Sequence, residues 1–587
     1  MEKKRAHQLH IYCFLTVPLS LCMATAALAV SEDALVPNSP EVRAQLPAGE
    51  AGYAILPLSP MLKLRPDQLP PDRPAEEVQL DVARGEAESL QVLLTPVNGD
   101  LLQVVVTAEL RNPAGQLLPI ELERLGYVPV SHPTAVGFRT PGRYPDPLFP
   151  LRPFDVRLGE SGGVWLTVRV PREATAGEYR GEVRFTPANA PSRVLPFTLR
   201  VHDVTLPTPG YLRSLVLVYD GIPWYKDRWP EALDSMFARL LNERFTPTWL
   251  GVPWDGVFTR DADGRWQADW TAFDVAIEGW LAKGATTFWV PWEPFGVDLA
   301  LSQDQNVLAD AAAKLRLLDE HIVARGWQGR FYRYAFDEPS PDRILAISRY
   351  CAFIRQHAPH LVVPVTSSMP GLQGTGTAWV PHIHELDSPA HAAFLARQRA
   401  RGDEIWMYTC MGTRWAKHPD TWRIDNYGAS HRAVGWVLWR FGCDAYLYWN
   451  ASYWKTGSGE SEKLYDLLAE PVIINDTNYP DGHCNGDGFL FYPDPAGQNL
   501  PYPSVRLAIT RDGFEDYDLL RLLEERVRAI RANPALHERL GPERLNRALG
   551  LLTTEPLVMS AGEYEHDPLP YEQRHREMLE ALANLAY

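Results

Sequence analysis

Residues 304–339, DQNVLADAAAKLRLLDEHIVARGWQGRFYRYAFDEP, contain the pattern that decides the fold. Apolar residues recur at helical spacing up to Trp327, and RFYRYAF then has the aromatic and apolar content of a β-strand. Asp337 and Glu338 follow at once, where this strand should end. A helix, a strand and two acids in this order predict one unit of a parallel α/β sheet, with both acids at a strand's carboxyl end.

The same alternation of strands and helices extends to both sides of this stretch. Strands are expected near residues 214, 246, 287, 331, 361, 378, 404 and 444, with helical segments between most of them. Eight such strands predict a (β/α)8 barrel of the TIM type. A doubly wound open sheet is the alternative, but no glycine-rich nucleotide fingerprint follows the first strand, which disfavours it.

The residues before this α/β region have a different texture. From Gly52 to Leu206, short runs of apolar and β-branched residues are divided by glycine and proline turns, which predicts an antiparallel β-sandwich. PTPG at 207–210 marks the boundary. The expected organisation is a signal peptide (1–29), a leader (30–51), the β-sandwich (52–207) and the barrel with C-terminal helices (208–587).

The N-terminus has the features of a secretory signal. Lys3, Lys4 and Arg5 precede an apolar run that ends at ALA, residues 27–29, which fits the cleavage rule for small residues. The protein is therefore expected to be secreted or periplasmic, with no stable membrane anchor after cleavage. A retained anchor helix is the alternative, since the run approaches spanning length.

The composition of the chain limits the classes of ligand and partner that we expect it to bind. The net charge of −16 argues against a nucleic-acid partner, which would favour a basic surface. Six cysteines show no paired spacing for zinc, so no metal and no cofactor are expected. Oxygen-bearing residues near the C-terminal third lack the regular spacing of a calcium loop; they are Asn475, Asp476, Asn478, Asp481 and Asp487.

Asp337 and Glu338 are the candidate catalytic residues. Most glycosidases place two carboxyl groups on opposite sides of the scissile bond, which neighbouring side chains do not do easily. In a substrate-assisted reaction, the 2-acetamido oxygen of the substrate is the nucleophile, Glu338 is the general acid and Asp337 orients the acetamido group. The alternatives are a helix that starts at Pro339 and gives the two acids no chemical role, a separate nucleophile such as Glu293 or Asp387, and a non-catalytic glycan-binding barrel.

Two further features bear on the site. Of the 19 tryptophans only Trp165 precedes the boundary, and many others fall at expected strand ends, where they would stack on sugars or fill the core. In the segment 484–525, four charged residues are expected to form ion pairs, with sugar contacts by Asp487 or Arg511 as the alternative. The four are Arg506, Arg511, Glu515 and Asp516.

YAFDEP at 334–339, together with GDGFLFYP and PYPSVRLAITRDGFEDYDLLRLL in the segment 486–523, resembles glycoside hydrolase family 123. VARGEAESLQVLL and VPREATAGEYRGEVRF resemble the β-sandwich that precedes the barrel in that family. The resemblance implies a retaining, exo-acting β-N-acetylgalactosaminidase-like enzyme, whose partner is a glycan with a terminal N-acetylhexosamine. Its adjacent acids map onto Asp337 and Glu338. Substrate-binding residues are predicted from their positions at strand ends and in the GDG loop: Tyr334, Trp292, Tyr408, Trp449, Asn450 and Asp487.

Overall fold

The computed structural model describes residues 31–72, 75–133, 140–218, 222–296, 304–334, 336–366, 377–410, 422–456, 463–475 and 483–585. The expected signal peptide, and Asp476, Asn478 and Asp481 of the weak calcium motif, lie outside these residues. Within them, no helix has both the length and the apolar content needed to cross a membrane.

Two five-stranded sheets form the N-terminal part of the molecule. The first has the order β2 (Tyr53–Leu58), β5 (Ala87–Pro96), β10 (Gly162–Arg169), β7 (Ile120–Val130) and β8 (Gly142–Pro150). The second has the order β4 (Val78–Arg84), β12 (Arg193–Thr205), β11 (Gly177–Thr186), β6 (Leu101–Arg111) and β9 (Phe154–Val156). One hydrophobic cluster contains residues of both sheets. The pairing is antiparallel except between β12 and β4, which are parallel, unlike the purely antiparallel expectation.

The first sheet is buried on both faces, which explains polar residues in its central strands. All ten residues of β5 are buried. One face contributes to the cluster shared with the second sheet, and the other face contributes to the large core of the remaining chain. Gln91 on β5 donates hydrogen bonds to the carbonyls of Ser59 and Leu62, at 2.8 and 2.7 Å. Such bonds offset the cost of burying a polar amide.

Parallel strands and helices alternate in the second part of the chain. A five-stranded parallel sheet has the order β13 (Arg213–Val216), β21 (Ala445–Tyr448), β20 (Glu404–Thr409), β19 (Ala378–Trp379) and β18 (Pro364–Val365). A separate parallel pair joins β16 (Phe288–Trp289) and β17 (Phe331–Tyr332). The intervening helices are α3 (Trp229–Asn242), α4 (Thr271–Ala282), α5 (Gln305–Ala324), α6 (Ile344–His357), α7 (Pro389–Ala400) and α8 (Gly428–Arg440).

Single parallel bridges extend this sheet toward a barrel. Tyr332 pairs with Val362 and Phe336 with Val365, which connects β17 to β18, and Val216 pairs with Pro247. In the described residues no backbone ladder joins the segment at 247 to β16, although Thr246 and Thr286 share a side-chain hydrogen bond of 2.8 Å. The chain is thus a mixed α/β protein with an arc of parallel strands, and a complete barrel stays a prediction.

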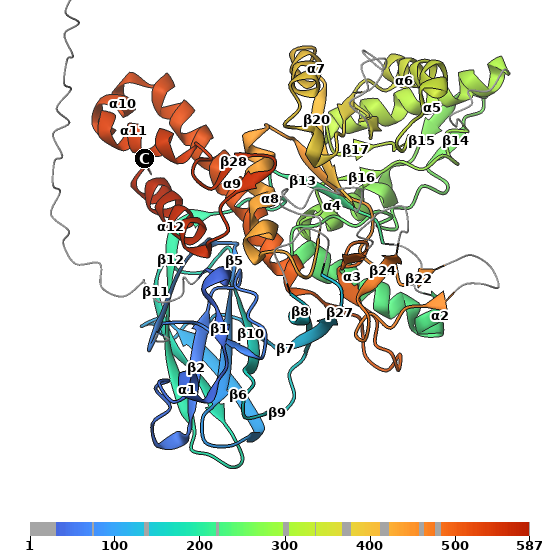
Figure 1. Ribbon diagram of the computed structural model, residues 1–587. Helices are drawn as coiled ribbons and strands as arrows, with labels where there is room; N and C mark the ends of the chain where they lie inside the picture. The colour runs from blue at the N-terminus through green and yellow to red at the C-terminus, as the bar shows by residue number, and fades with distance from the viewer. Residues whose placement is uncertain are drawn as a thin grey trace, which may run out of the picture.

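The C-terminal helices pack against both parts (Figure 1). They are α9 (Val505–Ala532), α10 (Pro534–Leu540), α11 (Pro542–Leu551) and α12 (Pro568–Asn584), with β28 (Val558–Ser560) and β29 (Glu563–Tyr564) before α12. Shorter elements are β1 (Val36–Pro37), α1 (Pro40–Arg43), β3 (Gln68–Leu69), α2 (Ile222–Tyr225), β14 (Phe258–Arg260), β15 (Trp266–Ala268), β22 (Lys455–Thr456), β23 (Lys463–Leu464), β24 (Val472–Asn475), β25 (His483–Asn485), β26 (Phe491–Tyr492) and β27 (Tyr502–Pro503).

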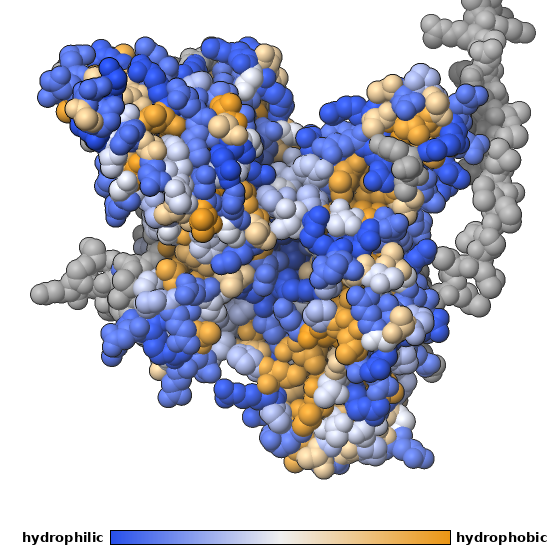
Figure 2. Space-filling model, turned by 180° about the vertical axis from the view of Figure 1, so that it is seen from behind, coloured by the Kyte–Doolittle hydropathy of each residue, from blue (hydrophilic) through white to orange (hydrophobic). Residues whose placement is uncertain are grey.

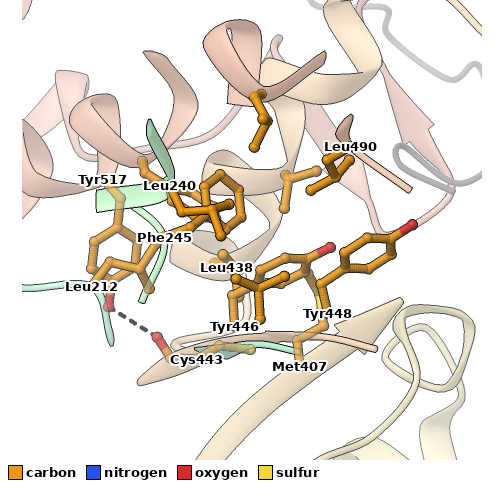
Figure 3. Packing of buried hydrophobic residues seen from close by; sticks show 14 of the residues in the cluster. Leu212, Leu240, Phe245, Met407, Leu438, Cys443, Tyr446, Tyr448, Leu490 and Tyr517 are labelled. Carbon is orange, nitrogen blue, oxygen red and sulfur yellow. Dashed lines mark hydrogen bonds between the residues drawn. The ribbon is translucent and has the colours of Figure 1, made fainter. Parts of the chain in front are cut away.

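Helix α9 is the central element of this assembly. It approaches α8 so closely that a Cβ atom on Gly435 would lie 1.8 Å from the carbonyl oxygen of Gly513. The Tyr517 hydroxyl donates to the Cys443 carbonyl at 2.9 Å within the hydrophobic packing around α9 (Figure 3). Arg506 pairs with Asp146 of β8, and Arg511 with Glu243, both at 2.9 Å. The expected ion pairs are confirmed, and sugar contact by Arg511 is wrong because its side chain is fully buried.

The surface separates into parts of different polarity. On the face shown in Figure 2, hydrophilic residues predominate, and two upper lobes are divided by a notch. Hydrophobic residues gather over the lower part, where Figure 1 places the N-terminal sheets. Smaller hydrophobic patches also lie on the upper lobes of this face (Figure 2).

Candidate active site

A cavity of about 350 Å³ lies at the carboxyl end of the parallel strands. Within the described residues, the cavity is lined by the ends of five strands and by the segment after β21. The lining residues are Leu217, Tyr334, Asp337, Glu338, Thr366, Tyr408, Cys410, Leu447, Trp449 and Tyr453. The carboxyl ends of parallel strands are the usual location of ligand sites in α/β proteins. Both predicted catalytic residues are exposed in this cavity.

The helix after the acids begins later than expected. Ser340 is the N-cap, Pro341 starts a 3-10 helix that ends at Arg343, and α6 begins at Ile344. The expectation that Pro339 starts the helix is therefore wrong. Asp337 and Glu338 precede the N-cap, so the stabilisation of acids in a helix's first turn does not explain them.

The backbone turns sharply at Glu338. Its φ is 39°, in the left-handed region, and its N–H donates to the Thr366 hydroxyl at 2.7 Å. Non-glycine residues in this region cost about 1–3 kcal/mol and cluster at functional sites. In an extended chain, successive side chains point to opposite faces. The turn allows Asp337 and Glu338 to line the same cavity despite being neighbours.

Two hydroxyl groups contact Asp337. Tyr334 donates to Oδ1 at 2.7 Å, and the Thr366 hydroxyl lies 3.2 Å from the same oxygen. Burial, together with the negative charge of Asp337, raises the pKa of Tyr334 well above its ordinary value, so the phenol keeps its proton for donation. In the described part of the chain both contacts reach Oδ1. Oδ2 therefore remains available to accept a hydrogen bond from a substrate.

Glu338 is held by a tyrosine from another strand. Tyr408, in β20, donates to Oε1 of Glu338 at 2.6 Å. Burial, then the hydrogen bond to Glu338, raises the pKa of Tyr408 above its ordinary value, so this phenol is also protonated. The second oxygen, Oε2, has no hydrogen bond within the described residues and is free to exchange a proton with a substrate.

Trp449 forms an aromatic part of the cavity wall. Its half-buried ring contacts Tyr453, with ring centroids 5.4 Å apart. Its Nε1 donates to Oδ2 of Asp487 at 3.2 Å, and Tyr448 donates to Oδ1 of that residue at 3.0 Å. Asp487 is only 2% exposed and does not line the cavity. It therefore holds Trp449 from behind.

Two other predicted contacts lie away from the cavity wall. Trp292 packs under the guanidinium of buried Arg333, 4.2 Å from the ring centroid, and beside Tyr350. Asn450 is fully buried and accepts from the Ser452 N–H at 2.8 Å. Of the six predicted substrate-binding residues, Tyr334, Tyr408 and Trp449 therefore line the cavity, whereas Trp292, Asn450 and Asp487 do not.

Sequence reasoning missed Thr366, whose hydroxyl accepts from the Glu338 N–H and lies 3.2 Å from Oδ1 of Asp337. Its signal was a polar residue at the end of LVVPVT, where the fifth expected strand stops. The alternative carboxylates lie elsewhere. Asp387 accepts from the N–H groups of Ala561 and Gly562, at 2.8 and 3.0 Å, and Glu293 is exposed outside the cavity lining. Among the described lining residues, Asp337 and Glu338 are thus the only carboxylates.

Comparison with known proteins identifies one family. Residues 297–523 match the model of the glycoside hydrolase 123 catalytic domain. The chain is similar in structure to a family 123 glycoside hydrolase from Clostridium perfringens, with a TM-score of 0.56 and 13% identity over 91% of this chain and 97% of that chain.

Weaker structural matches include two other glycoside hydrolases. One is a family 5 xyloglucanase from Bacteroides ovatus, with a TM-score of 0.26 and 10% identity over 74% of this chain and 98% of that chain. The other is a family 39 enzyme from Bacteroides cellulosilyticus, with a TM-score of 0.29 and 10% identity over 74% and 81%. No curated protein matches the sequence.

Proposed function

We propose a reaction for this chain on the premise that it contains a glycoside hydrolase family 123 catalytic domain and is a glycosidase. The proposed reaction is exo-acting hydrolysis of a terminal β-linked N-acetylhexosamine, with retention of configuration and assistance from the substrate. N-acetylgalactosamine is the sugar that the family resemblance favours. The Clostridium perfringens relative is described as hydrolysing glycolipid glycans. A glycan of that kind is a suitable first substrate to test.

The observation that carries this proposal is the adjacency of the only two carboxylates in the described cavity lining. Enzymes with two opposed carboxyl groups hold them about 5–5.5 Å apart for retention or about 6.5–9.5 Å apart for inversion, on either side of the bond. Asp337 and Glu338 are consecutive residues and enter the cavity from one edge. A nucleophile on the other face of the sugar then has to come from the substrate, and a 2-acetamido group supplies one.

In the first step, Asp337 accepts a hydrogen bond from the acetamido N–H, which directs the acetamido oxygen at the anomeric carbon. The bond from this oxygen to the anomeric carbon forms as the glycosidic C–O bond breaks. Glu338 gives its proton to the departing oxygen. The products are the free leaving group and an oxazolinium ion whose positive charge lies beside the Asp337 carboxylate.

In the second step, Glu338 acts as a base. It takes a proton from water as the water oxygen attacks the anomeric carbon, and the oxazolinium ring opens to restore the acetamido group. Two inversions at one carbon retain its configuration. Tyr334 and Tyr408 hold one oxygen of each acid, and Trp449 offers a face on which the apolar side of the sugar ring stacks.

A panel of aryl glycosides tests this function. We expect turnover of the β-GalNAc substrate, weaker or no turnover of β-GlcNAc, and none of the plain β-galactoside, which lacks the acetamido group. Efficient cleavage of the galactoside would favour a separate carboxylate nucleophile. Binding without turnover across a broad glycan panel would favour a non-catalytic glycan-binding barrel.

We also propose the finer features of fold and location that the sequence predicts. The strand arc closes into a (β/α)8 barrel over residues 208–587, the sheets of residues 52–207 form a β-sandwich, and removal of residues 1–29 releases a secreted or periplasmic protein. N-terminal sequencing of the protein from its native host tests the cleavage. A mature chain that begins at Met1 would contradict it.

A further inference from the structure

A buried group of two glutamates and a histidine lies where the first N-terminal sheet meets the C-terminal helices. Glu86 and Glu88, at the start of β5, are 2% and 7% exposed, and His575 in α12 is 4% exposed. One carboxylate oxygen from each glutamate and one ring nitrogen of the histidine all lie within 4.8 Å of one another. This group shares no residue with the cavity around Asp337 and Glu338.

The spacing around His575 is unusual for hydrogen bonding. Its Nε2 lies 3.6 Å from Oε1 of Glu86 and 3.4 Å from Oε1 of Glu88. Nε2 is buried and has no hydrogen-bond partner within the described residues. Both separations exceed the usual hydrogen-bond range of about 2.7–3.2 Å. A tetrahedral Zn²⁺ ion with bonds of about 2.0–2.2 Å needs ligand atoms about 3.3–3.6 Å apart, which these pairs match.

We propose that Glu86, Glu88 and His575 bind a structural Zn²⁺ ion that ties β5 to α12. Neighbouring groups also hold two of these ligand side chains in place by hydrogen bonds, as they do in known zinc sites. The other ring nitrogen, Nδ1, lies 3.0 Å from Oδ1 of Asp516, and a zinc-binding histidine usually donates this proton to a carboxylate. The second oxygen of Glu86 accepts from the Ala83 N–H at 2.5 Å, which fixes the carboxylate.

A neighbouring cavity has room for the fourth ligand. Glu88 and His575 both line a cavity of about 50 Å³. This volume is more than the roughly 10–15 Å³ that one water molecule requires. A water molecule there would complete a tetrahedral set of two carboxylates, one imidazole and one water.

The local charge also favours a cation. Arg432 forms its ion pair with Asp516, and both glutamates face the histidine ring. Without metal, a protonated imidazole would be the competing cation. Burial lowers the pKa of His575, but Glu86, Asp516 and Glu88 raise it, with a net rise to about 10. The test must therefore separate a bound metal from a buried imidazolium ion.

Metal analysis of the full-length protein separates these two states. After production in zinc-containing medium and extensive dialysis, we expect roughly one zinc ion per chain by elemental mass spectrometry. Protein produced with Co²⁺ instead should show the visible absorption of tetrahedral cobalt. Glu88→Gln and His575→Gln should both lose the metal, whereas Glu572→Gln, which changes a carboxylate lining the same 50 Å³ cavity outside the ligand group, should keep it.

The wild-type protein alone also decides the question if the variants fail to fold. We expect metal-free protein, produced in zinc-depleted medium, to unfold at a Tm lower by about 3 °C or more than the zinc form. Zinc content below roughly a tenth of an ion per chain, with no cobalt spectrum and equal Tm values, would overturn the proposal in favour of the imidazolium. One equivalent of a different metal would overturn the assignment to zinc. None of these readouts depends on glycosidase activity.

Discussion

Two pairs of adjacent acids have opposite surroundings in this molecule. Asp337 and Glu338 are exposed in the cavity, and their partners are the hydroxyls of Tyr334, Thr366 and Tyr408.

Glu515 and Asp516, in α9, are 3% and 0% exposed, and each forms an ion pair with an arginine. Arg244 lies 3.0 Å from Glu515, and Arg432 lies 2.7 Å from Asp516. The same two residue types therefore form a candidate active site in one place and a structural network in the other.

The difference lies in which oxygens remain available. Asp516 uses both oxygens: Arg432 and His575 contact Oδ1, and Arg432 and Trp436 contact Oδ2. Asp337 and Glu338 each retain one oxygen without a partner in the described chain. Hydroxyl donors hold the exposed acids without neutralising them, whereas arginines compensate the charge of the buried acids. We therefore expect Asp337 and Glu338 to take part in catalysis, and Glu515 and Asp516 to stabilise the fold.

The largest expected effect is on turnover at the exposed pair. Glu338→Gln removes the proton donor and should lower kcat by about 10²–10⁴-fold on natural glycans, since general acid catalysis contributes that much. Activated aryl leaving groups need less protonation and should suffer less. Asp337→Asn cannot stabilise the oxazolinium charge and should fail on both substrate types.

Steady-state kinetics on both substrate types check this prediction. Asp387→Asn is the matched control, because this carboxylate caps the turn before β29 rather than lining the cavity. Wild-type rates in both Glu338→Gln and Asp337→Asn would show that the site is wrong. A loss of activity in Asp387→Asn alone, with its fold intact, would point to a separate nucleophile.

Disrupting the buried pair should instead destabilise the folded protein. Asp516→Asn leaves Arg432 buried without its counter-charge, and removing one partner of a buried ion pair costs about 3–5 kcal/mol. Thermal unfolding followed by circular dichroism should show a clearly lower Tm. Glu524→Gln, on the more exposed part of α9, should cost about 1 kcal/mol or less. Equal Tm changes in the two variants would contradict the contrast.

The pH dependence of stability provides a second test of the role of the buried acids. Burial raises the pKa of Glu515 from 4.5 to about 7, against the opposing effect of Arg244 and Arg511. Between these two values the folded state binds more protons at this site than the unfolded state, so its contribution to stability falls as pH rises. Glu515→Gln cannot ionise. Its Tm relative to wild type should therefore increase from about pH 5 to about pH 8; parallel Tm curves would contradict this account.

A smaller effect is expected from the tyrosines that hold the exposed acids. Tyr408→Phe removes the hydrogen bond to Glu338, a bond to a charged group worth about 1.5–3 kcal/mol, and should lower kcat/KM by roughly tenfold or more. Its pH–rate profile should also shift, because the Tyr408 phenol no longer donates to the catalytic carboxylate. Tyr127→Phe, which alters a buried hydroxyl on β7 outside the cavity, is the control. A lower Tm with an unchanged profile would indicate a purely structural role for Tyr408.

Sequence periodicity predicted the arrangement of elements better than the details of the site. The helix–strand alternation located Asp337 and Glu338 at a strand end because successive parallel units bring these ends to one edge. Tyr334 and Tyr408 were reached by the same reasoning. The same reasoning also selected Trp292, which does not line the cavity, because position at a strand end does not reveal that its ring packs on Arg333.

The features of the site that the sequence did not predict depend on contacts between distant segments of the chain. Thr366 reaches the acids from another strand, and Asp487 acts through Trp449, so neither role follows from local spacing. The 3-10 turn that leads into α6 begins at Pro341 rather than Pro339, and local sequence does not decide between these two prolines. The group of Glu86, Glu88 and His575 is formed by residues from opposite ends of the chain, which no short motif can indicate.

Fluorination of the acetamido group tests the central claim most directly, because it weakens the oxygen that is proposed to attack. Aryl N-acetylhexosaminides with mono-, di- and trifluoroacetamido groups differ little in size but steeply in nucleophilicity. A substrate-assisted enzyme should show kcat/KM falling steeply and steadily along this series. A flat series, together with efficient cleavage of the plain β-galactoside, would contradict the account and require a nucleophile from the protein.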